Sequence, residues 1–269
     1  MSQPTLSAQI KELEDQLGVR IFERDRKRVL VTPRGATIVA HAKNVLVAVG
    51  DLVRAADASR DPFAGTLRVG VIPTIAPYLL PEISPALAVR WPNLRLAFRE
   101  EKTADVVAHL EDGSLDAGLI ALVPEIESPD FAHVVVTGDR FVAAMPKDHP
   151  LAKRKRVALG DLEDEPVLLL DDGHCLRTQA LALCAKGGAR ETDLRATSLA
   201  TLVQMVASGA GITLLPELAV PVENRRAQLE IRPFVAPAPT RTVVLVWRKA
   251  SPQGDALREI AGAMTKALR

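Results

Sequence analysis

Residues 66–122 read TLRVGVIPTIAPYLLPEISPALAVRWPNLRLAFREEKTADVVAHLEDGSLDAGLIAL. In this stretch, runs rich in Val, Leu, Ile and Phe alternate with helix-like runs. The strand candidates are 67–72, 95–98 and 117–122, and the helix candidates are 78–90 and 104–110. Strands that alternate with helices in this way form a parallel sheet. The stretch therefore predicts a βαβαβ unit and an α/β fold.

The alternation continues toward the C-terminus. Further strand candidates are 141–145, 167–170, 194–197, 212–215 and 242–247, and further helix candidates begin at 175, 198 and 255. We expect two α/β lobes, with lobe I formed by about 66–139 and 242–269 and lobe II by about 140–241. Open sheets of this kind bind ligands at the carboxyl ends of their strands, so a binding cleft is expected between the lobes.

Residues 1–58 show a different pattern, and 59–65 form a predicted hinge. A helix is expected over 2–17, a two-stranded ribbon with a basic tip over 19–31, and a long helix over 33–58. The apolar residues of the long helix repeat at heptad spacing, namely Val39, Ala42, Leu46, Val49 and Val53. Two explanations stay open here: the helix packs on its own domain, or it pairs with a second copy of the chain.

The composition is that of a globular protein, with 269 residues of which 48% are hydrophobic and 25% charged. The longest uninterrupted apolar run, 180–185, has six residues, and the N-terminus lacks the basic and apolar regions of a secretory signal. We therefore expect no membrane span and a cytoplasmic location. The net charge of +1 conceals a basic N-terminal part, because residues 1–60 hold ten Lys or Arg against seven Asp or Glu. That excess predicts a local cationic surface.

Motifs for common cofactor and catalytic chemistry are missing. The five histidines are scattered and the two cysteines lack Cys-x-x-Cys spacing, so no metal site is predicted. Neither a glycine-rich nucleotide loop nor a nucleophile elbow occurs. We therefore expect no cofactor and no enzyme activity.

The two cysteines have the strongest chemical signal. Cys175 follows a strand-like run and a turn, and so begins the next helix, where the helix dipole favours the thiolate. Cys184 lies on an apolar face of the same helix. Nine residues of helix separate the two by about 13.5 Å and put them on opposite faces, whereas a disulfide needs Cα atoms within roughly 7 Å. Either the two thiols are unrelated, or their disulfide remodels the helix and acts as a switch.

Several motifs together resemble one family. Residues 2–14, SQPTLSAQIKELE, and 17–24, LGVRIFER, are similar to the recognition helix and wing of LysR-type transcriptional regulators. The resemblance covers essentially the whole chain. It implies a partial winged helix-turn-helix, a linker helix, and a two-lobed α/β effector domain that resembles periplasmic binding proteins. Within that family, GHCLR at 173–177 followed by Cys184 resembles the branch that senses hydrogen peroxide.

The resemblance also implies a role for each matching residue. In the effector domain, Cys175 is the peroxide-reactive thiol and Cys184 the resolving thiol, and the peroxide-pocket residues are Thr74, His174 and Arg248. The implied DNA contacts are Gln3, Pro4, Thr5 and Ser7 in the recognition helix and Arg24, Lys27 and Arg28 in the wing.

The partners implied by the resemblance are double-stranded operator DNA, hydrogen peroxide, a thiol reductant system, RNA polymerase, and further copies of the chain as a dimer or tetramer. On this interpretation, a Cys175–Cys184 disulfide activates antioxidant genes. The family's helix-turn-helix begins with helices that precede Ser2. We therefore expect the chain to be truncated at its N-terminus by a start assigned too far downstream.

Three other functions stay open at this point. A LysR-type regulator that responds to a small organic inducer would keep its response without Cys175. A thiol peroxidase would turn over peroxide continuously, but it would leave the basic ribbon without a role. A solute-binding module would share the two-lobed fold, but such modules normally carry an export signal.

Overall fold

The computed structural model describes residues 2–24, 28–58 and 61–268. The chain divides into two compact units, 1–53 and 54–269. Helix α2 (Pro33–Ala58) crosses the boundary between the two units.

The first unit contains α1 (Gln3–Leu17), a ribbon of β1 (Phe22–Arg24) and β2 (Val29–Val31), and the first part of α2. Pro4 occupies the first turn of α1, where its missing N–H costs no hydrogen bond, and Gly18 ends the helix at φ 62°. The Glu14 carboxylate accepts hydrogen bonds from the backbone N–H groups of Ile21 (2.7 Å) and Phe22 (2.9 Å), which fixes α1 against the ribbon. The predicted helix and ribbon are therefore present, although the first strand begins at Phe22 and not at Val19.

Helix α2 exposes a line of large apolar side chains within this unit: Val45, Leu46, Val49, Leu52 and Val53. By length and composition, residues 33–53 could cross a membrane, with a mean hydropathy of 1.4 and none of the window buried. This criterion tests length and composition only, so the expectation that the chain has no membrane span stays a prediction. The same exposed apolar residues at heptad spacing are also typical of a helix that pairs with another helix.

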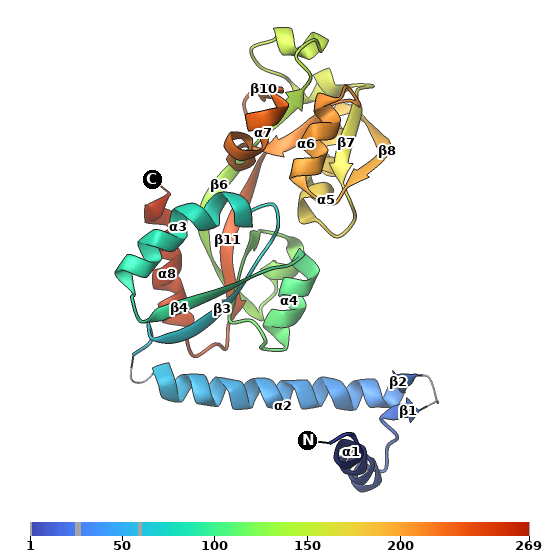
Figure 1. The fold of residues 1–269 in the computed structure, drawn as a ribbon, viewed down its shortest axis with the longest axis vertical. Helices are drawn as coiled ribbons and strands as arrows, with labels where there is room; N and C mark the ends of the chain where they lie inside the picture. Colours follow the sequence, from blue (N-terminus) through green and yellow to red (C-terminus); the bar gives the residue numbers. More distant parts are fainter. Residues whose placement is uncertain (1, 25–27, 59–60, 269) are drawn as a thin grey trace. The chain divides into compact units, whose positions relative to one another are not determined.

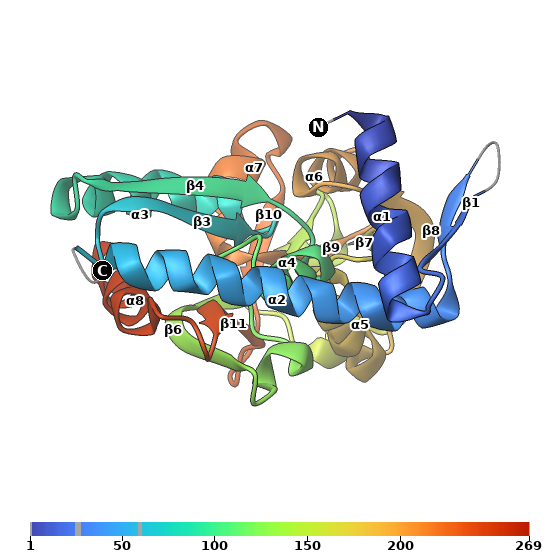
Figure 2. The same ribbon diagram turned by 90° about the horizontal axis from the view of Figure 1, so that it is seen from below.

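The second unit is built on a seven-stranded mixed sheet with the strand order β10-β6-β11-β5-β3-β4, in which β9 also pairs with β6. Its first three strands are β3 (Gly65–Val71), β4 (Leu94–Glu100) and β5 (Ala117–Ala121), and β3 pairs in parallel with both others. Helices α3 (Ala76–Arg90) and α4 (Thr103–Glu111) connect them. This confirms the predicted βαβαβ unit, and β3 and β4 run side by side in both views (Figure 1, Figure 2).

Two long antiparallel strands, β6 (Phe131–Met145) and β11 (Thr240–Arg248), run through both halves of this unit (Figure 1). Strand β6 pairs first with β11 and then with β9 (Thr213–Pro216) and β10 (Glu230–Pro233). The prediction started β6 ten residues too late and missed β10. The half-exposed segment 131–140 contains polar residues and a glycine, and it lacks the apolar run by which buried strands are recognised.

The remaining elements surround a second, two-stranded sheet. Strand β7 (Pro166–Leu170) pairs in parallel with β8 (Arg190–Ala196), and α5 (Cys175–Gly187) connects them. Helices α6 (Leu199–Ala207), α7 (Val220–Ala227) and α8 (Gly254–Ala267) complete the unit. The buried apolar residues form two cores. We call the core that contains β3–β5 and α8 the lobe I core, and the one that contains β7, α5 and α6 the lobe II core.

A candidate thiol switch between two lobes

The turn before α5 places Cys175 at the first position of that helix. Gly173 makes the turn at φ 88°, and His174 is the N-cap residue. Lys102, which precedes α4, reaches across to this turn and donates a hydrogen bond from Nζ to the backbone oxygen of Asp172 at 2.8 Å. The strand, turn and helix predicted around Cys175 are thus present, and a cation from the lobe I side holds the turn.

The two cysteines share one unbroken helix but lie in different surroundings. Both are free thiols. Cys175 is half-buried and packs against the lobe I core, whereas Cys184 is 3% exposed inside the lobe II core. Burial, assisted by the Glu191 carboxylate, raises the pKa of Cys184 to about 11. At neutral pH, Cys184 is therefore a protonated thiol shielded from solvent.

Cys175 and His174 line a groove of about 650 Å³ between α4, residues 122–125 and α5. Two polar atoms from residues in its wall, Thr103 Oγ1 and Gln179 Oε1, are buried and have no hydrogen-bond partner among the described residues. Thr103 was not predicted, because only the fold brings the start of α4 to this groove, whereas Gln179 follows Cys175 by one turn of α5 and could have been found from that spacing. A buried polar group without a partner is costly, and neither of these two atoms is accessible from the groove in this structure.

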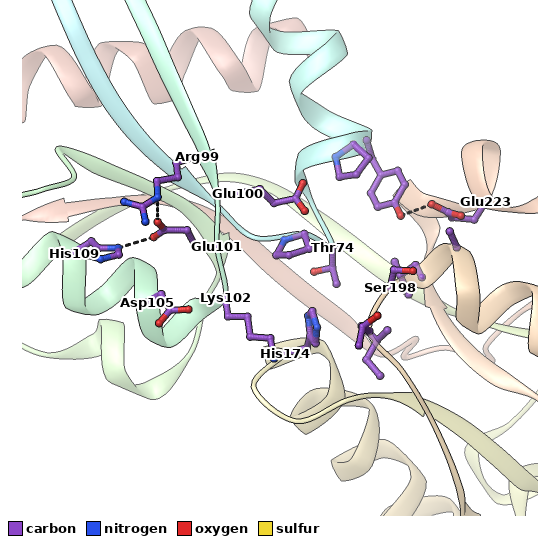
Figure 3. A pocket seen from close by; sticks show the side chains of 17 residues that line it. Thr74, Arg99, Glu100, Glu101, Lys102, Asp105, His109, His174, Ser198 and Glu223 are labelled. Atoms are coloured by element: carbon purple, nitrogen blue, oxygen red, sulfur yellow. Dashed lines mark hydrogen bonds and ion pairs between the residues drawn. The ribbon is translucent and has the colours of Figure 1, made fainter. Parts of the chain in front are cut away.

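His174 also lines a second cavity of about 670 Å³, to which both lobes contribute side chains. Thr74, Glu100, Lys102 and His174 face this cavity from different elements (Figure 3). Tyr78 Oη donates a 2.7 Å hydrogen bond to Glu223, and burial together with this carboxylate raises the pKa of Tyr78. The cavity is thus polar and charged, and it is the cleft expected between the lobes.

Thr74 is held by a buried arginine that sequence analysis did not select. Arg241 Nη1 donates to Thr74 Oγ1 (3.0 Å) and Nη2 to the Thr74 carbonyl oxygen (2.8 Å). The same guanidinium forms a fully buried ion pair with Asp139 through Nε and Nη2, each 2.8 Å from Oδ2. Arg241 therefore fixes both the backbone and the hydroxyl of Thr74.

Arg248 is not among the residues that line either of these two cavities. It lies seven residues after Arg241 on β11, about 23 Å farther along the strand, and its Nη1 donates to the carbonyl oxygens of Leu110 (2.7 Å) and Leu115 (3.2 Å). A role for Arg248 at the peroxide therefore stays a prediction, whereas Arg241 is the arginine of β11 that contacts Thr74 of the cleft.

Arg177 lies two residues after Cys175, and its charge is paired with carboxylates. Its buried guanidinium pairs with Asp172 (2.9 Å) and Glu191 (2.7 Å) and donates to the Leu170 carbonyl oxygen (3.2 Å). These contacts join the start of α5 to the preceding turn and to β8, so Arg177 fixes the helix and its charge is neutralised locally.

The residues expected to contact DNA lie on the first unit. Gln3, Pro4 and Thr5 are exposed on α1 and Ser7 is half-buried there, while Ser2 and Thr5 share a 2.7 Å hydrogen bond between their hydroxyls. Arg28 is exposed at the start of β2. Lys27 and the side chain of Arg24 lie outside the described residues. Within the described ranges, no cluster of three or more His, Cys, Asp or Glu could hold a metal ion.

Removal of Arg241 should be strongly destabilising. Arg241→Met leaves Asp139 buried without its partner, so we expect the unfolding free energy to fall by about 3–5 kcal/mol. The matched control is Arg140→Met at the exposed neighbouring position on β6, where we expect a change within about 0.5 kcal/mol. Urea unfolding followed by the fluorescence of Trp91 and Trp247 measures both variants. Equal losses in the two would show that the buried pair does not hold this part of the fold.

The His174 imidazole should stay unprotonated at pH values just below 6.5, the ordinary pKa of histidine. Burial lowers the pKa of His174 from 6.5, the Lys102 ammonium adds to the shift, and Asp171 opposes it. Below about pH 6.5 the unfolded chain gains a proton that the folded chain refuses, so this group lowers the unfolding free energy as the pH falls. We expect a His174 NMR titration midpoint below 6.5 and a weaker dependence of stability on pH in His174→Asn. A midpoint at or above 6.5 would contradict this.

Comparisons with known proteins agree with this architecture. Residues 1–36 match the model for the bacterial regulatory helix-turn-helix protein, lysR family, and residues 60–269 match the LysR substrate binding domain. The chain is 44% identical to the DNA-binding transcriptional dual regulator OxyR of Escherichia coli K12, covering 98% of this chain and 86% of that protein. It is also 44% identical to a probable hydrogen peroxide-inducible genes activator of Mycobacterium avium, covering 97% and 84%.

Solved structures give the same result. A full-length OxyR variant of Pseudomonas aeruginosa superimposes with a TM-score of 0.79 at 38% identity, covering 98% of this chain and 86% of that one. A mutant of Corynebacterium glutamicum OxyR with bound H2O2 gives 0.74 at 35% identity, covering 100% and 84%. With both family models matched and the similarity covering 97–100% of this chain and 84–86% of these relatives, the chain belongs to the LysR family of transcriptional regulators and, within it, to the OxyR group.

Proposed function

We propose that this chain is a hydrogen peroxide-sensing transcriptional regulator of the cytoplasm, switched by a Cys175–Cys184 disulfide. One observation carries the proposal: an accessible thiol begins α5 in the wall of a groove, and a second thiol is buried nine residues later in the same helix. The names of the relatives, hydrogen peroxide-inducible genes activator and OxyR, support the same function.

The first chemical step takes place at Cys175. Its thiolate attacks one oxygen of hydrogen peroxide, the O–O bond breaks, and water leaves as the sulfur becomes a sulfenic acid. Thr103 and Gln179 line the same groove as this sulfur. We place Thr74, which Arg241 holds in the cleft, His174, which lines both cavities, and Arg248 around the peroxide when the sensor is loaded.

The second step requires a change of conformation. In α5, about 13.5 Å of helix separates the cysteines, and Cys184 lies in the lobe II core. The Cys184 thiol condenses with the sulfenic acid to give the disulfide and a second water only after this helix has opened. A thiol reductant supplies the two electrons that restore both thiols. The covalent change is therefore coupled to the refolding of the segment around α5.

The first unit supplies the genetic output in this proposal. Its match to the lysR-family helix-turn-helix and the exposed Gln3, Pro4, Thr5 and Arg28 support operator DNA as the partner of α1 and the ribbon. The exposed heptad positions of α2 support pairing of two copies through this helix, with a tetramer as the larger assembly and RNA polymerase as the partner of the activated form. We assign 1–58 to DNA binding and dimerisation, 59–65 to a hinge and 66–269 to sensing.

Mass spectrometry of the two cysteine variants tests the switch. After one equivalent of hydrogen peroxide, we expect the reduced native chain to form an intramolecular Cys175–Cys184 disulfide, and Cys184→Ser to stop at a sulfenic acid on Cys175, trapped by dimedone. Cys175→Ser should show neither product, because the remaining thiol is buried and protonated. If both thiols stay reduced in the native chain, the sensor assignment is wrong and a small organic inducer becomes the better explanation.

A further inference from the structure

Most of the groove beside Cys175 is lined by apolar side chains, which hydrogen peroxide, a small polar molecule, does not need for binding. Its volume of about 650 Å³ is in the usual range for sites that bind small organic molecules. Glu111, Glu125 and Thr178 also line this groove. The larger part of its wall is apolar and is formed by Ala104, Val107, Ala108, Leu122, Val123 and Ala182. Hydrogen peroxide has no carbon to place against such a wall, so the groove offers binding energy that this oxidant does not use.

A molecule bound in this groove lies next to the reactive thiol. Cys175 lines the apolar groove but not the charged cleft, whereas His174 lines both. A peroxide with its O–O bond at the Cys175 sulfur would therefore direct any organic substituent along α4 and α5. Burying that substituent is favourable by roughly 25 cal/mol per Å² of apolar surface.

We propose that Cys175 also reacts with organic hydroperoxides, whose alkyl or aryl group binds in this groove. The inference rests on the proposed function and widens the class of oxidants that the sensor detects. The Cys175 sulfur attacks the terminal oxygen of R–O–O–H, the O–O bond breaks, and the hydroxyl passes to sulfur as a sulfenic acid. The alkoxide takes the thiol proton and leaves as the alcohol R–OH, so sulfur loses two electrons and the peroxide gains them.

Rate constants for two oxidants test this. The reduced full chain is mixed with cumene hydroperoxide or hydrogen peroxide, quenched with an alkylating agent at intervals, and the Cys175–Cys184 disulfide is quantified by mass spectrometry. We expect the second-order rate constant with cumene hydroperoxide to be within tenfold of that with hydrogen peroxide, or larger.

Groove variants separate binding from reactivity. Ala108→Gln on α4 and Ala182→Gln on α5 place a neutral polar side chain in the groove at exposed positions, where the fold tolerates it. Each should slow the reaction with cumene hydroperoxide about tenfold, which corresponds to about 1.4 kcal/mol of binding, while hydrogen peroxide reacts within twofold of the native rate. The matched control is Ala185→Gln, exposed on α5 outside the groove, which should change neither rate.

The outcomes are distinct. If hydrogen peroxide forms the disulfide but cumene hydroperoxide reacts more than a hundredfold more slowly, the groove does not bind organic hydroperoxides and the inference is wrong, while the proposed function stands. Equal slowing of both oxidants by the groove variants would overturn it in the same way. If neither oxidant modifies Cys175, the inference and the proposed function are both wrong.

Discussion

The constraint on which the sensor depends is that Cys175 and Cys184 belong to one intact helix. Helix geometry sets them about 13.5 Å apart along α5 and on opposite faces, and each packs against a different core. A disulfide cannot form while α5 persists. In the proposed switch, a two-electron oxidation of sulfur thus becomes a choice between two conformations, because the thiols permit the helix and the disulfide forbids it.

The free-energy cost of opening α5 has several identifiable parts. Opening α5 exposes Leu176 and removes Cys184 from the lobe II core, and exposing one buried leucine costs about 1.5–3 kcal/mol. The ion pairs of Arg177 with Asp172 and Glu191 and the hydrogen bond from Lys102 to the turn must also rearrange. Each 1.4 kcal/mol of such cost raises the reduction potential of a disulfide by about 30 mV. The packing of the reduced state thus favours return of the oxidised sensor to thiols, which suits a switch that must be reset.

The sequence predicted most of the regular structure, and it predicted less about long-range contacts. Apolar runs and their spacing located β3–β5, α3–α6, α8 and the helix start at Cys175, because these signals are local. The half-exposed first part of β6 and the short β10 carry no such signal. Arg241, which holds Thr74, was not predicted, because only the folded sheet shows which end of β11 reaches the cleft. The apolar groove with Thr103 and Gln179 arises from the packing of α4 and α5, two helices far apart in the chain.

Hydrogen exchange of the reduced and peroxide-treated chain tests the coupling between the disulfide and α5 most directly. The account predicts that backbone amides of residues 178–187 are protected in the reduced chain and lose that protection when the disulfide forms. Amides of β3 and β5, which belong to the lobe I core, should stay protected in both states. A Cys175–Cys184 disulfide formed with full retention of protection across α5 would contradict the account.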